Sequence, residues 1–151
     1  MENQKEQLYK AKVVDNRKVT MQYALNDLLG KSTVNRFDLA IGYFYISGLL
    51  MIKDTFTEFM ETKNGSINIL MGNETNEITK NTINTAFLVS HSYDDYERET
   101  YRSQFKNDIQ SLAEEDKLFL MKFVDWVYQK KIEVKVYTGQ ANYFHAKSYM
   151  F

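Results

Sequence analysis

The sequence contains no cysteine and no proline, and only six glycines among its 151 residues. The absence of cysteine excludes disulfides, thiolate metal sites and a cysteine nucleophile. Because proline is absent, turns are expected where glycine, asparagine, aspartate and serine gather, as in residues 63–66 and 138–142. No apolar run is long enough to cross a bilayer, and the first residues lack the pattern of a secretory signal, which predicts a cytoplasmic protein without a membrane partner.

A strong charge of one sign is also missing. Lysine and arginine number 19 against 20 aspartates and glutamates, so the formal net charge is -1. No overall positive field draws the chain onto phosphate backbones, and any contact with nucleic acid must be local. Aromatic residues, in contrast, are abundant, with 11 tyrosines and 10 phenylalanines. A chain of this length and apolar content is expected to form one folded domain, residues 1–151.

The first half of the chain alternates helical and strand patterns. Apolar residues at helical spacing run from Met21 and stop at Gly30, which predicts a helix. Residues 37–45 are short, aromatic and branched, as expected of a central strand covered on both faces. Ser47 is predicted to cap a second helix whose apolar stripe ends at Met60, and residues 67–71 are predicted to form another strand.

The second half is predicted to begin with helices over residues 77–130, with breaks at 90–96 and 113–116. Residues 132–136 then alternate between apolar and charged, and residues 144–151 are expected to pair with them as a hairpin. Strands interleaved with helices predict an α/β fold in which helices pack on a mixed sheet. Because the last three residues are apolar, we expect this chain to be the N-terminal fragment of a longer protein.

His145 and Lys147 are the candidate catalytic pair. On a strand, side chains two positions apart share a face, so imidazole and ammonium are expected to lie side by side. A neutral imidazole nitrogen can attack phosphorus, and an ammonium can neutralise charge on the non-bridging oxygens without a metal ion. The same spacing is also common on solvated strand faces, which is the alternative interpretation.

The segment Phe144-His145-Ala146-Lys147-Ser148-Tyr149-Met150-Phe151 resembles the first arm of the His-x-Lys motif of the phospholipase D superfamily. Residues 37–44 (FDLAIGYF) and 67–72 (INILMG) resemble the preceding strands in phospholipase D-like domains at the front of bacterial helicase-like and restriction-type proteins. The resemblance covers most of residues 35–151, although each motif is short. It implies one phospholipase D-like half, truncated before the rest of the family motif.

The resemblance also implies a function. His145 would be the nucleophile that forms a phosphohistidine, and Lys147 would bind the phosphoryl oxygens. The protein would be a metal-independent phosphodiesterase or nuclease, with DNA as its partner and a helicase or restriction-type domain in the same polypeptide. The alternative is a catalytically inactive module that binds nucleic acid or dimerises. A lipid-cleaving enzyme is a weaker possibility, because no basic amphipathic helix is evident.

Catalysis requires a second histidine that acts as the acid, because one imidazole cannot serve as nucleophile and acid in the same step. A symmetric dimer that brings two copies of His145 together is the preferred hypothesis. His91 is the other histidine, but no lysine lies two residues after it. His91, Asp94 and Asp95 lack the spacing of a zinc or calcium motif, and Asp94 suits a helix cap. Neither a metal nor another cofactor is expected, because glycine-rich phosphate and dinucleotide loops are missing.

Overall fold

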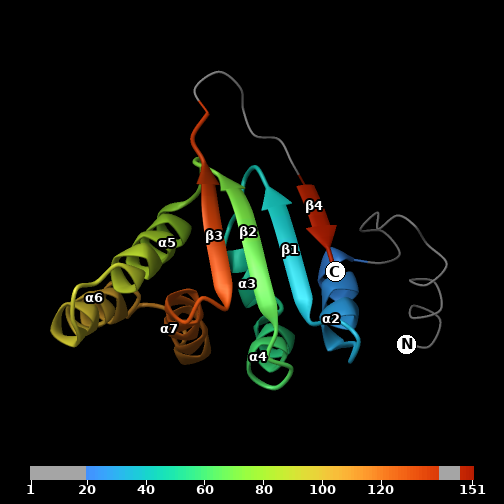
Figure 1. Cartoon of the computed structure of the whole chain (residues 1–151), viewed down its shortest axis with the longest axis horizontal. Coiled ribbons are helices and arrows are strands. Elements are labelled where there is room, and N and C mark those ends of the chain that lie inside the picture. Colours follow the sequence, from blue (N-terminus) through green and yellow to red (C-terminus); the bar gives the residue numbers. More distant parts are fainter. Residues whose placement is uncertain (1–19, 140–146) are drawn as a thin grey trace.

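The computed structural model describes residues 20–139 and 147–151, which form a four-stranded sheet with helices packed on one face (Figure 1). β1, β2 and β3 are parallel, and β4 is antiparallel to β1. The predicted α/β fold with a mixed sheet is therefore confirmed. In the spatial order β3-β2-β1-β4, the strands are β1 (Arg36–Ile41), β2 (Ser66–Gly72), β3 (Ile132–Tyr137) and β4 (Lys147–Met150).

Most of the helices lie where their apolar spacing predicts. Thr20, Asn76 and Asp94 start three of them, because each side chain accepts a hydrogen bond from the backbone N–H three residues later. No helix in the described part of the chain is both long and apolar enough to cross a membrane. The helices are α2 (Met21–Gly30), α3 (Ser47–Leu50), α4 (Lys53–Glu61), α5 (Glu77–Ser90), α6 (Asp95–Asp108) and α7 (Glu114–Tyr128).

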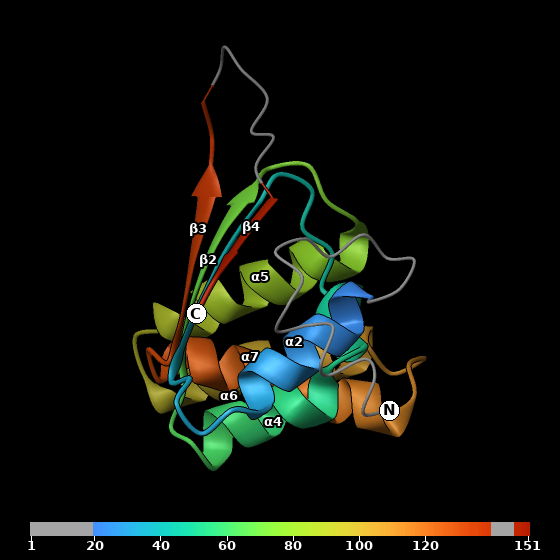
Figure 2. The same ribbon diagram turned by 90° about the vertical axis from the view of Figure 1, so that its right-hand side faces the viewer.

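The helices cover one face of the sheet because of the direction of the connections. The crossovers from β1 to β2 and from β2 to β3 step the same way across the sheet. Right-handed crossovers that step the same way place their helices on the same face, and Figure 2 shows this arrangement. β1 is an inner strand of the sheet, as predicted for residues 37–45. The expected cover on both faces is wrong for the described residues, and the strand ends already at Ile41.

The other face of the sheet carries polar side chains that alternate with the buried ones. On β1, the guanidinium of Arg36 donates two hydrogen bonds to the carboxylate of Asp38, at 2.9 and 3.0 Å. On β2, the amide of Asn68 donates to the same carboxylate at 2.6 Å. The hydrogen bond from Arg36 is the main cause that lowers the pKa of Asp38, and Asn68 contributes to this shift. Mutually paired polar groups therefore occupy part of this face, and the exposed side chains of Leu70 and Met150 lie on it as well.

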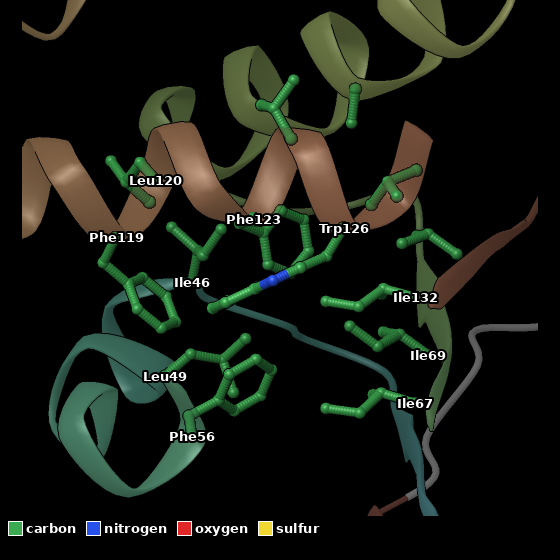
Figure 3. Packing of buried hydrophobic residues seen from close by; sticks show 14 of the residues in the cluster. Ile46, Leu49, Phe56, Ile67, Ile69, Phe119, Leu120, Phe123, Trp126 and Ile132 are labelled. Carbon is green, nitrogen blue, oxygen red and sulfur yellow. The ribbon is translucent and has the colours of Figure 1, made fainter. Parts of the chain in front are cut away.

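The core lies between the sheet and the helices (Figure 3). Phe56 of α4 and Phe119 and Trp126 of α7 form a cluster of three rings whose centroids lie 5.4 to 5.9 Å apart. These rings pack toward the inward-facing isoleucines of β2 and β3, which are almost fully buried. Burial of each large side chain contributes about 1.5–3 kcal/mol, so this cluster is a main source of stability.

Two predictions near the sheet are wrong. β4 does not form a hairpin with β3; it pairs with β1, and β2 lies between β1 and β3. The antiparallel pairing places Tyr149 and Phe151 in stacking contact with the buried ring of Phe37, at centroid distances of 6.3 and 4.7 Å. Ser47 is not a helix cap either, because Ile46 occupies the cap position of α3 without a side-chain hydrogen bond. The backbone N–H of Ile46 is instead bound by Thr79.

Candidate functional site

Lys147 lies at the edge of the sheet where the parallel strands end. It is the first residue of β4, and because β4 is antiparallel to β1, it pairs with Ile41, the last residue of β1. The loops that follow β1 and β2 leave the sheet at the same edge (Figure 1). In open α/β sheets, ligands bind in the crevice outside the carboxyl ends of the strands. The lysine of the predicted pair therefore occupies the usual ligand-binding edge.

Lys147 lines a pocket of about 750 Å³. The pocket lies between β1 and β4 on one side and the helices α2 and α3 on the other. Within residues 20–139 and 147–151, no carboxylate forms an ion pair with the exposed side chain of Lys147. Among these residues, the ammonium group has no acidic partner that would compete with an anion in the pocket.

Aromatic side chains form the walls of this pocket. Tyr43 and Tyr45 follow β1 and are 41% and 47% exposed, and both line the pocket together with Lys147. Leu39 and Leu49 provide a buried apolar floor. The pocket therefore offers one positive charge beside flat and apolar surfaces, which suits a ligand that has an anionic group next to a planar one.

A buried hydrogen-bond network holds the loop that carries the two tyrosines. The hydroxyl of Thr79 in α5 accepts from the backbone N–H of Ile46 at 2.9 Å and donates to the side chain of Asn76 at 2.6 Å. The hydroxyl of Thr75 donates to the backbone carbonyl of Phe44. Thr79 is fully buried. The network ties the loop after β1 to the start of α5, and so positions the wall of the pocket.

Sequence reasoning missed this network, although a signal was present. Thr79 and Thr82 lie at helical spacing with Ile83 and Ala86, on the stripe of α5 that faces the core. A hydroxyl on a buried stripe must find a hydrogen-bond partner, because an unpaired buried polar group is costly. Such a threonine therefore bonds either to a neighbouring backbone, as Thr79 does, or to its own helix, as Thr82 does.

Two glycines bring the loops after β1 and β2 together. The backbone N–H of Gly72 donates to the carbonyl of Gly42 at 3.1 Å, which extends the ladder between the two strands. A Cβ atom at position 72 would lie 2.3 Å from that carbonyl oxygen. Only glycine permits this approach, so the position of both loops depends on it.

Tyr149 shares the pocket-lining face with Lys147, as the alternation of a strand requires. Burial raises the pKa of Tyr149, which keeps its hydroxyl protonated. His145, the other half of the predicted pair, lies outside the described residues. Its position beside Lys147 therefore stays a prediction from the sequence.

His91 lies in the turn between α5 and α6, on the side of the sheet away from β4 (Figure 1). Its Nδ1 donates to the carbonyl of Phe87 at 2.8 Å. Asp94 caps α6, as predicted, and Asp95 pairs with Arg98 at 2.6 Å. The part of the chain that the structure describes contains no group of three or more histidine, aspartate or glutamate side chains arranged to hold a metal ion. These three residues serve local structure and lie apart from the pocket.

No protein-family model, no curated protein and no solved structure matches this chain. The resemblance to the phospholipase D superfamily therefore depends on its motif residues alone. Of the predicted catalytic pair, Lys147 has a described position, and it lines the pocket.

Proposed function

We propose that this chain is a phospholipase D-like phosphodiesterase domain that cleaves nucleic acid without a metal ion, as part of a larger helicase-like or restriction-type protein. One observation carries the proposal: the ammonium of Lys147 lines an open pocket at the carboxyl edge of the sheet. An ammonium there can bind the oxygens of a phosphodiester. His145, two residues earlier, supplies the imidazole that the reaction needs.

The proposed reaction has two steps. In the first, a neutral ring nitrogen of His145 attacks phosphorus, the new N–P bond forms, and the bond from phosphorus to the leaving oxygen breaks. Lys147 neutralises the non-bridging oxygens, and a second acid protonates the leaving oxygen. In the second step, water attacks phosphorus and the N–P bond breaks. The water proton passes to the group that acted as the acid, which regenerates the site and leaves a phosphomonoester and an alcohol.

The acid that protonates the leaving oxygen would come from a partner. A second copy of the chain that contributes its own His145 satisfies the requirement, as in a symmetric dimer. His91 is a poor candidate for this role, because its turn lies away from β4 and its Nδ1 is bound to its own helix. The activity is therefore expected to depend on association.

The test is cleavage of labelled DNA in EDTA by the longest natural polypeptide that carries this chain. We expect His145→Ala and Lys147→Ala each to lower the rate by at least a hundredfold, because they remove the nucleophile and the charge that stabilises the transition state. His91→Ala is the matched control and should keep the wild-type rate. Cleavage that survives His145→Ala would refute the proposal. DNA binding through Lys147 without cleavage would indicate the inactive binding module instead.

A further inference from the structure

We infer that the pocket beside Lys147 takes an unpaired nucleotide, so that the domain acts on single-stranded nucleic acid in preference to a duplex. The inference rests on the proposed function for the role of the phosphate, and it adds what the neighbouring surfaces recognise. Three features of the pocket carry it: the exposed aromatic walls, the apolar floor and the single positive charge.

The first feature is the pair of tyrosine side chains on the loop after β1. The large aromatic side chains of the core, such as Phe56 and Phe123, are fully buried, whereas Tyr43 and Tyr45 leave nearly half of their surface in solvent beside Lys147. Bases of a single strand stack on exposed aromatic rings, and every base has a face that can do so. In a duplex those faces are already stacked on neighbouring bases, so they cannot stack on the two tyrosine rings.

The second feature is the polarity of the pocket. Besides the two rings, the lining contains aliphatic side chains from β1, α2 and α3, such as Leu39, Leu25 and Leu49, and fewer polar ones, namely Thr20, Gln22 and Ser47. An apolar hollow next to an ammonium suits a base and its adjoining phosphate, because the base loses water contacts that are weak while the phosphate gains a charge partner. A double-helical backbone, which presents sugars and phosphates only, would leave the hollow unfilled.

The third feature is charge. Among the described residues that line the pocket, Lys147 is the sole cation. Arg36, the nearest cationic residue on β1, is bound to Asp38 on the open face of the sheet. Proteins that hold a duplex neutralise several phosphates along its backbone. One cation is sufficient for one phosphate, which a stacked base can then supplement.

The experiment compares three probes by fluorescence anisotropy: a short labelled DNA strand, the same sequence as a blunt duplex, and the same strand with its bases replaced by abasic sites. The wild-type chain is expected to bind the strand at least tenfold more tightly than either other probe. Tyr45→Ala should weaken binding of the strand by about 5- to 150-fold, the usual effect of losing one stacking platform. Its binding of the abasic strand should not change.

Two further variants control for the ring and for a general surface effect. Tyr45→Phe keeps the aromatic face and should bind the strand as the wild type does. Tyr93, which is 96% exposed in the turn before α6, is the matched tyrosine outside the pocket, and Tyr93→Ala should have no effect. Lys147→Ala should weaken binding of all probes, and the wild-type affinity for the strand should fall only slowly with salt, as expected of about one phosphate contact.

The outcomes separate this inference from the proposed function. Equal binding of the duplex and the strand, with no effect of Tyr45→Ala, would refute the single-strand preference even if cleavage through His145 is found. Tight binding of the strand through Tyr45 without cleavage would uphold the inference and refute the enzyme. Binding of phosphatidylcholine vesicles in place of DNA, weakened by Tyr45→Ala, would show that an acyl chain fills the hollow and would overturn the inference.

Discussion

The layer between the sheet and the helices is filled at one end and open at the other. Beneath β2 and β3, the buried rings of Phe56, Phe119 and Trp126 pack against one another (Figure 3). Beside β1 and β4, the same layer opens into the pocket that holds Lys147. At this end, Gly48 of the short helix α3 lines the pocket, and a Cβ atom at its position would meet no other atom within 4 Å. One end therefore supplies stability, and the other supplies a place for a ligand.

Phe123→Ala, in the filled end of the layer, should have the largest effect on stability. The side chain is fully buried, so the change removes its burial and leaves a cavity. We expect the free energy of unfolding to fall by about 3–5 kcal/mol, measured by urea denaturation. Leu118, on the same helix but 61% exposed, is the control, and Leu118→Ala should change the stability by less than about 0.5 kcal/mol. Equal effects of the two changes would contradict the core described above.

Thr79→Val tests whether the open end depends on the hydrogen bonds that position its loop. The change keeps the side-chain size but leaves the N–H of Ile46 without its partner, so stability should fall by about 1–2 kcal/mol. Binding of single-stranded DNA should weaken as well, because the tyrosine wall loses its support. Thr82 is equally buried but donates only to the carbonyl of Ile78 within its own helix. Thr82→Val should therefore affect DNA binding little.

Gly48→Leu should sharpen the contrast by filling the open end. A Cβ atom at position 48 meets no other atom within 4 Å, and the larger side chain can enter the pocket without displacing the core. We expect the stability to change by less than about 1 kcal/mol while binding of the labelled strand falls. Gly30→Ala, at an equally open position in α2 but outside the pocket lining, is the control and should leave binding unchanged. A large loss of stability in Gly48→Leu would show that the space is not available.

The smallest effect on stability should come from the sheet face opposite the helices, where Arg36 pairs with Asp38. Arg36 lowers the pKa of Asp38, so the ionised carboxylate stabilises the folded chain above its unfolded pKa, and this contribution is lost as the pH falls through the folded value. The stability difference between the wild type and Asp38→Asn should thus shrink below about pH 4. Because Asp38 is partly exposed, the difference should be small at every pH. Chemical denaturation at several pH values checks this, and a difference that grows in acid would contradict it.

Much of the secondary structure could be predicted from apolar spacing. α2 ends at Gly30 as predicted, and β3 alternates between buried Ile132 and Val134 and exposed Glu133. The end of β1 could not be predicted in this way, because the aromatic run continues past Ile41 into the loop that carries Tyr43. Apolar residues in a pocket wall and in a strand look alike in a sequence, since both are partly shielded from water.

The strand with which β4 pairs could not be predicted from the sequence either. Residues that follow a strand and a turn usually pair with that strand, but β4 crosses the sheet and lies beside β1. Phe37 on β1 offers a ring against which Tyr149 and Phe151 stack, and this long-range contact has no local signal. The pairing matters for the site, because it sets Lys147 against the tyrosine loop rather than beside the end of β3.

The sequence by itself determined the alternation of side chains, and thereby that Lys147 shares a face with Tyr149. That property depends only on the local geometry of an extended chain. Which strand lies next to Lys147, which face the helices cover and where the layer stays open were decided by the tertiary structure. These features follow from the right-handed crossovers and from contacts between residues far apart in the chain, which no local pattern contains.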